Sequence, residues 1–426
     1  MSSHSCSSRH FSWLVKSCIP TTTQHHRHCP APHPLTAPSA AAAMLCQTTI
    51  SSLPDDLLLE CLSRVSHSCL PSLPLVCRRW SHLVDSPTFH SLRRRCDLLR
   101  LTLFALSISD HSLLFSASLC LGFESVWNVS SFLLANEGIH QGTVSSLFSH
   151  SRLVAIGRRI YVIGRTAMIC CDTWTGTAAS LQGPIASRKK FAAAAVAGKI
   201  YVAGGCGRTD AVEEYDPRNR KWRVVSTASR KRYGCVGTAV DGVFYVIGGL
   251  KIGSSGNEGV VVPGSRAAGS DAAHLYASSM DLYDVALGQW LRSRTVPGGG
   301  CVVAACAAGG SVYVLSSHAV ELSFWKFNGT RKSSSFGEWC RLTSPPLPAQ
   351  VRLDSTVRFG CVGAGGTVVL IQVTGCIDDL LRRSGRSQRG FKEGLVMVYD
   401  CAAGEWSRGA DLPEGIRRAA CVTVEC

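Results

Sequence analysis

The residues that could bind a metal or act as nucleophiles are few, and their spacing is poorly suited to either task. His25, His26, His28 and Cys29 form one cluster of potential ligands, but it lies in a low-complexity stretch without a second ligand pair at zinc-finger spacing. The 21 cysteines include no Cys-x-x-Cys pair. Glycine-rich phosphate loops and Gly-x-Ser-x-Gly elbows are missing from the sequence as well. We therefore expect no metal, no cofactor and no catalytic site.

The net charge of the chain indicates which kind of partner it could bind. Its 44 Lys and Arg outnumber 29 Asp and Glu, which gives a net charge of +15 and favours anionic partners. The basic residues are spread along the chain without a zinc-finger, recognition-helix or aromatic–basic RNA pattern. An acidic protein target is therefore favoured over nucleic acid.

Composition predicts a globular protein made mainly of β-structure. The 426 residues suffice for two unequal domains, and 46% hydrophobic with 17% charged residues can support packed cores. Forty glycines against five methionines, with short apolar runs between turns, favour strands over helices. No run of 18 apolar residues occurs, so we expect no membrane span. The cysteines suit a reducing compartment, the cytoplasm and/or the nucleus.

Residues 1–50 differ from the rest of the chain. They contain no acidic residue and are rich in Ser, Thr, His, Pro and Ala. This composition predicts a disordered extension, and an organelle transit peptide is the disfavoured alternative.

Residues 51–95 have the pattern of a small helical domain. Ser52 is a candidate N-cap and Pro54 suits a first helical turn. The apolar residues that follow recur at helical spacing: Leu58, Leu62 and Val65.

A second amphipathic helix is expected to follow the first. Its apolar residues are Leu73, Val76, Cys77, Trp80 and Val84. Because so short a domain cannot bury all its apolar stripes internally, part of that surface should contact a partner or the downstream domain.

These residues resemble the F-box motif over some 40 positions. The resemblance implies a surface that binds a Skp-family linker protein, and through it a cullin. The residues that it assigns to linker binding are Leu53, Pro54, Leu57, Leu62, Leu73, Val76, Cys77 and Trp80.

Internal repeats occupy the rest of the chain. The stretch from Gly198 to Gly205 recurs 44 residues later as Gly242 to Gly249, each with a Tyr-Val pair and a final diglycine. A Tyr-Asp dipeptide followed six residues after its Asp by Trp occurs three times, at Asp216, Asp284 and Asp400. One repeat predicts a small antiparallel sheet, and several such sheets can pack radially as propeller blades.

The diglycine, Tyr-Asp and Trp pattern resembles the kelch repeat. We predict a kelch-type β-propeller over residues 151–426 with about six blades, five of them recognisable, and with five blades as the alternative. Residues 98–150 are expected to be a linker or a degenerate first blade. The segment Ala419–Cys426 reads as a lone strand that could complete the first blade and close the ring.

Arginines precede several repeats at similar positions. Arg188 lies 13 residues before Tyr201, and Arg232 lies 13 before Tyr245, while Arg358 and Arg417 precede later strands. We predict that these four arginines lie on one rim and attract an acidic target. The alternative is that they are solvated loop charges or make structural hydrogen bonds.

The function that these predictions favour is substrate recognition within an SCF (Skp-cullin-F-box) ubiquitin ligase, by a subunit that is not itself an enzyme. A propeller scaffold that works without a ligase is the alternative. Blade loops vary freely on a constant scaffold, so the sequence does not identify the target.

Overall fold

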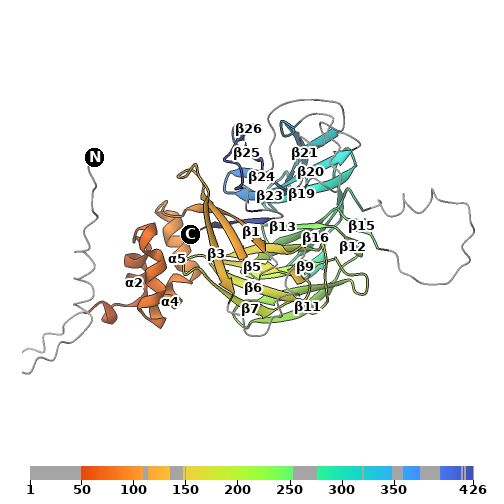
Figure 1. Ribbon diagram of the computed structural model, residues 1–426. Coiled ribbons are helices and arrows are strands. Elements are labelled where there is room, and N and C mark those ends of the chain that lie inside the picture. The colour runs from red at the N-terminus through yellow and green to blue at the C-terminus, as the bar shows by residue number, and fades with distance from the viewer. Residues whose placement is uncertain are drawn as a thin grey trace, which may run out of the picture. The chain divides into compact units, whose positions relative to one another are not determined.

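The computed structural model describes residues 49–108, 114–134, 147–148, 150–252, 276–318, 321–347, 358–374, 394–413, 416 and 419–425. The chain divides into two compact units, Met1–Cys96 and Asp97–Cys426, and each is described by itself. The described part of the first unit is helical, whereas the second unit consists mainly of strands (Figure 1). None of the described helices is long and apolar enough to cross a membrane.

The first unit consists of short helical segments, which are η1 (Ile50–Ser52), α2 (Asp55–Ser63), η2 (His67–Ser72), α3 (Leu73–Val76), α4 (Arg78–Val84) and α5 (Pro87–Arg95). Helix α2 begins directly after Pro54, and the carboxylates of Asp55 and Asp56 lie in its first turn, where they meet the positive end of the helix. The prediction of Ser52 as its N-cap was wrong, because Ser52 ends the preceding turn η1.

The apolar stripe expected as one second helix is interrupted at Cys77. The backbone of Cys77 is extended, with φ −163° and ψ 165°, so α3 ends before it and α4 begins after it. The Cys77 sulfur accepts a hydrogen bond from the backbone N–H of Trp80 at 3.5 Å and thereby caps α4. The apolar spacing continues across this break, which is why the pattern alone predicts a single helix.

The helical unit has a core of its own. The core side chains are buried and come from all the longer segments: Leu58, Leu62, Leu70, Leu73, Val84 and Phe89. Arg93 of α5 is 1% exposed and donates to the backbone oxygens of Ser63 and Val65 at 2.9 and 2.8 Å. It thus satisfies the carbonyl group of Ser63, the last residue of α2, and that of Val65 two residues further on.

The second unit is a six-bladed β-propeller. Its first blade is β1 (Leu101–Ile108), β2 (Leu114–Cys120), β3 (Asn128–Leu134) and β27 (Ala420–Glu425); the second is β4 (Arg152–Ile156), β5 (Arg159–Ile163), β6 (Ala167–Asp172) and β7 (Thr177–Gln182); the third is β8 (Ala192–Val196), β9 (Lys199–Ala203), β10 (Ala211–Asp216) and β11 (Lys221–Thr227). The fourth is β13 (Val236–Val240), β14 (Val243–Ile247), β16 (Ser279–Asp284) and β17 (Gln289–Trp290), with β18 (Arg294–Thr295) also pairing with β16; the fifth is β19 (Cys301–Ala308), β20 (Ser311–His318), β21 (Glu321–Asn328) and β22 (Trp339–Leu342); the sixth is β23 (Arg358–Ala364), β24 (Thr367–Thr374), β25 (Val396–Asp400) and β26 (Glu405–Arg408). Strands β12 (Arg232–Tyr233) and β15 (Leu250–Lys251) form a separate short pair.

The C-terminal strand closes the ring, as the sequence predicted. Strand β27 pairs antiparallel with β1, in a register that places Thr423 opposite Leu103. The innermost strands then pack in the order β27, β4, β8, β13, β19 and β23, and β23 packs on β27 again. Strand β3 also pairs in parallel with β7, which joins the first two blades at a second point. Six blades are therefore present, and the alternative of five is excluded.

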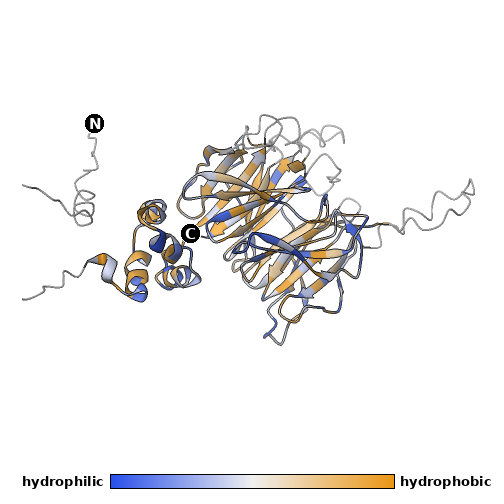
Figure 2. Ribbon diagram, turned by 90° about the horizontal axis from the view of Figure 1, so that it is seen from below, coloured by the Kyte–Doolittle hydropathy of each residue, from blue (hydrophilic) through white to orange (hydrophobic). Residues whose placement is uncertain are grey.

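Apolar packing holds neighbouring blades together. Among the described residues, a buried apolar cluster spans each of the six blade junctions. Figure 2 shows the matching concentration of hydrophobic residues along the strands. Each blade buries its faces against its neighbours, which explains why a single repeat could not be stable alone.

The repeated glycine and tryptophan residues build these junctions. Gly204 has φ +72°, and a Cβ there would lie 2.9 Å from the sulfur of Cys235, which directly precedes β13 of the next blade. The Trp of the outer strand donates its indole N–H to a carbonyl at the outer edge of the preceding blade. This bond recurs from Trp222 to Gln182 at 2.9 Å, from Trp290 to Thr227 at 2.8 Å and from Trp406 to Thr343 at 2.8 Å. In the first blade, Trp127 donates to Ala410 of the sixth blade at 2.9 Å.

Candidate functional site

The helical unit leaves large apolar side chains in solvent. Leu57 on α2 is 50% exposed, and Leu75 and Val76 at the end of α3 are 75% and 56% exposed. Pro54 and Cys77 are exposed as well. The unit is too small to cover these side chains with its own core, so they form a surface suited to a protein partner. Leu75 was not among the residues predicted from the sequence.

Two residues predicted to bind the linker belong instead to the core of the helical unit. Leu62 is 3% exposed and Leu73 is 6% exposed, so neither offers contact area to a partner. Leu53 and Trp80 are half-buried. Helix geometry explains this difference. Each amphipathic helix turns an apolar face toward the core of its own unit, and only apolar residues outside that face can contact a partner.

Arg79 ties the start of the unit to α4, a role that the sequence pattern did not reveal. Its guanidinium donates to Asp55 Oδ1 at 2.8 Å and to the backbone oxygens of Ser51 and Leu53. These bonds fix the Leu53-Pro54 segment beside α4. Arg79 is therefore a positioning residue for the exposed surface of α2.

The structure contradicts the prediction that Arg188 and Arg232 are charges on a propeller rim. Their side chains are 0% and 1% exposed, and each is bound to a buried carboxylate of its own blade. Arg188 Nη2 lies 2.6 Å from Glu213, and Arg232 Nη2 lies 2.6 Å from Asp281. The equal offset of 13 residues marks equivalent positions, but these positions point inward. Of the two readings, structural hydrogen bonding is the correct one.

Arg188 and Arg232 have equivalent hydrogen-bond partners in their two blades. Each guanidinium also donates to the backbone oxygen of the first glycine in its diglycine pair, to Gly204 at 2.7 Å and to Gly248 at 2.8 Å. Arg188 further donates to Ala211. The arginines thus hold the end of the second strand against the third within one blade.

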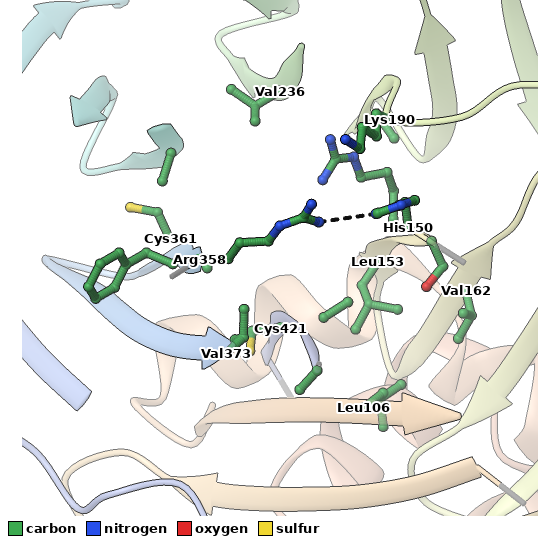
Figure 3. A pocket seen from close by; sticks show the side chains of 18 of the residues that line it. Leu106, His150, Leu153, Val162, Lys190, Val236, Arg358, Cys361, Val373 and Cys421 are labelled. Atoms are coloured by element: carbon green, nitrogen blue, oxygen red, sulfur yellow. Dashed lines mark hydrogen bonds between the residues drawn. The ribbon is translucent and has the colours of Figure 1, made fainter. Parts of the chain in front are cut away.

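Arg358 reaches toward the axis of the propeller, whereas Arg417 lies outside the described residues. Figure 3 shows Arg358 extending across an axial cavity toward His150, and its Nη1 lies 3.1 Å from His150 Nδ1. Burial, together with the positive charges of Arg358, Lys190 and their neighbours, lowers the pKa of His150 to about 4. Burial and neighbouring positive charges also lower the pKa of Lys190. Arg358 therefore belongs to a cluster of basic groups.

The described part of the chain holds no group of three or more His, Cys, Asp or Glu side chains arranged to bind a metal. The cluster from His25 to Cys29 lies outside the described residues.

The chain thus combines a helical unit that has exposed apolar side chains with a six-bladed propeller. Comparison with known families agrees: the F-box domain model matches residues 50–92 and the Kelch motif model matches residues 187–229.

Similarity to known proteins covers the whole chain. An F-box/kelch-repeat protein of Arabidopsis thaliana is 56% identical over 430 residues, which span 99% of this chain and all of the relative. The chain belongs to the F-box/kelch-repeat family. A second F-box/kelch-repeat protein of Arabidopsis thaliana is 26% identical over 58% of this chain and 61% of its own length. The solved structure of YjhT aligns with a TM-score of 0.44 at 16% identity, covering 62% of this chain and 84% of that one.

Proposed function

We propose that this chain is the substrate-recognition subunit of an SCF ubiquitin ligase. Its helical unit binds a Skp-family linker protein and, through it, a cullin, while the propeller holds a target protein for ubiquitination. The chain itself acts as an adaptor and catalyses no step. It works in the cytoplasm and/or the nucleus, a reducing setting that suits its many cysteines.

The observation that carries this proposal is the exposed apolar surface of the helical unit. Leu57 is 50% exposed and Val76 is 56% exposed, although the same unit buries Leu58 and Leu62. A few anchor side chains that become buried on binding give most of the binding energy in protein interfaces. Their positions within the F-box match make the linker the partner that fits best.

The purified full chain tests the proposal when mixed with a Skp-family linker and a cullin. Co-elution of the three proteins in size-exclusion chromatography is the expected result, with the cullin retained only when the linker is present. If the folded chain elutes apart from the linker, the ligase role falls and a propeller scaffold that works without a ligase takes its place.

A further inference from the structure

The six innermost strands of the propeller enclose a cavity of about 820 Å³. This volume lies within the range of about 300–1,000 Å³ that is usual for small-molecule sites. Apolar side chains from several blades line its wall, among them Leu106, Leu153, Val162, Val236 and Val373 (Figure 3). The cavity can therefore accommodate an apolar molecular body.

Basic groups gather on one side of this cavity at a repeated position. His150, Lys190 and Arg358 each lie 11 residues before the Tyr position of their repeat, which is Tyr161, Tyr201 and Val369 respectively. All three line the cavity. The repeat therefore brings together, from three blades, residues that are far apart in the sequence.

The backbone at two of these positions favours glycine, yet the chain has basic residues there. His150 and Lys190 have φ of 63° and 53°, and the equivalent residue of the fourth blade is Gly234 with φ 78°. A left-handed conformation costs a non-glycine residue free energy, and such strain is concentrated at functional positions. The strained backbone at His150 and Lys190 is a second observation, independent of charge, that marks the cluster.

The described surroundings supply these cations with no carboxylate. Arg152, which also lines the cavity, donates only to the backbone oxygens of Phe191 and Cys235, at 2.6 and 2.9 Å. Arg358 bonds to the His150 ring, and the Lys190 ammonium lies 5.5 Å from the Tyr233 ring centre. The buried arginines of the third and fourth blades differ, because each has its own carboxylate. Gathering like charges without a counterion is costly, and a bound anion would remove that cost.

We propose that the axial cavity binds a small organic anion, whose carboxylate or phosphate group is held by Lys190 and Arg358 and whose apolar body packs against the leucine and valine side chains of the wall. Charge-assisted hydrogen bonds from Arg and Lys are the usual means of holding such groups. The site goes beyond the ligase role and would exist even if the helical unit bound no linker.

Isothermal titration calorimetry of the full chain tests this proposal. The ligands are 1-naphthyl phosphate and 1-naphthoate, and the controls are inorganic phosphate and neutral 1-naphthalenemethanol. We expect the naphthyl anions to bind about tenfold or more tightly than either the bare anion or the neutral alcohol, because only they use both the charge and the wall. K190G and R358Q should each weaken the naphthyl anions by about tenfold. Glycine at position 190 copies Gly234, so K190G is expected to fold normally.

Arg220→Gly is the matched control. Arg220 is also a basic residue of the third blade with a left-handed backbone, φ 54°, but it lies in the exposed hairpin turn between β10 and β11. R220G therefore removes the same charge and the same strain away from the cavity, and it should bind as the wild type does. Failure of the wild type to bind either naphthyl anion would overturn the proposal, as would equal binding by K190G, R358Q and R220G. A hexaglutamate peptide that binds through Lys190 and Arg358 when the naphthyl anions do not would also overturn it, and would assign the cluster to an acidic segment of the target.

Discussion

Replacing Arg188 with Met should destabilise the propeller strongly. The Arg188 and Glu213 side chains are both 0% exposed, and the guanidinium donates to Glu213 through Nε at 3.1 Å and Nη2 at 2.6 Å. In R188M, Glu213 keeps only the backbone N–H groups of Ile185 and Ala186 as donors. Breaking a buried ion pair by removing one partner costs about 3–5 kcal/mol, because the other charge stays buried without compensation.

The assay is urea unfolding followed by tryptophan fluorescence, with the thermal midpoint as a second probe. The double variant R188M/E213L removes both charges. Its loss of unfolding free energy should be smaller than the sum of the losses in R188M and E213L, by about 2 kcal/mol or more. Arg223→Met is the matched control, because Arg223 pairs with Glu214 while its side chain is 66% exposed. Glu214 is 4% exposed but keeps Lys199 and Tyr201 as partners in R223M, so loss of the exposed guanidinium should cost at most about 1 kcal/mol. Equal stability of R188M and R223M would refute the structural role of Arg188.

Three further results are expected. Deleting Ala419–Cys426 removes β27 from β1 and from its neighbours in the ring, so the thermal midpoint of the whole propeller should fall; an unchanged midpoint would show that this strand does not close the ring. R79A should weaken linker binding by about tenfold in calorimetry while the circular dichroism of the chain is kept, and R79K should recover only part of the loss, since a lysine cannot reproduce the planar set of donors. Burial would raise the pKa of Glu214, but hydrogen bonds from its basic and tyrosine neighbours outweigh it and lower that pKa to about 2. The stabilisation by Glu214 is therefore complete above its ordinary pKa and is lost as pH falls from about 4.5 toward 2. Across this range the thermal midpoint of E214Q should vary less with pH than that of the wild type. Equal variation of the two midpoints with pH would contradict this.

The blades were predictable from the sequence because their motif residues have local geometric tasks. A diglycine is needed where two backbones meet, as at Gly205, and a Trp is needed where an indole N–H must reach the preceding blade. The first blade carries little of this pattern in β1, β2 and β3, and its fourth strand comes from the other end of the chain. The lone C-terminal strand was therefore the main clue to closure.

The direction of side chains was not predictable from repeat spacing. Arg188 and Arg232 occupy equivalent positions, but only the fold shows that they face buried carboxylates. One signal was available: Glu213 and Asp281 each lie two residues before the Tyr of a Tyr-Asp dipeptide, so equivalent acids accompany the equivalent arginines, and a buried charge requires a partner. Aligning the repeats at an offset of 11 rather than 13 would also have brought His150 and Lys190 together with Arg358.

In the helical unit, too, the sequence pattern did not predict the direction of side chains. The pattern correctly identifies which residues are apolar, but it does not separate those that build the core from those left exposed. Leu62 and Leu73 are buried, while Leu57 and Val76 in the same two helices are exposed. In addition, the extended backbone at Cys77 ends α3 and separates it from α4. A uniform helical period carries no information about such a break.

The most direct test of the proposed function is the affinity of the full chain for a Skp-family linker, measured by calorimetry for the wild type and for L57A/V76A. Truncating two exposed aliphatic anchors should cost about 2 kcal/mol or more in binding and leave the fold intact. V224A/L287A is the control, because these two propeller residues are similarly exposed, at 54% and 61%. Strong binding by the wild type and the control, with at least about a 30-fold loss in L57A/V76A, is the predicted result. Equal affinity of all three proteins, or no binding by the wild type, would contradict it.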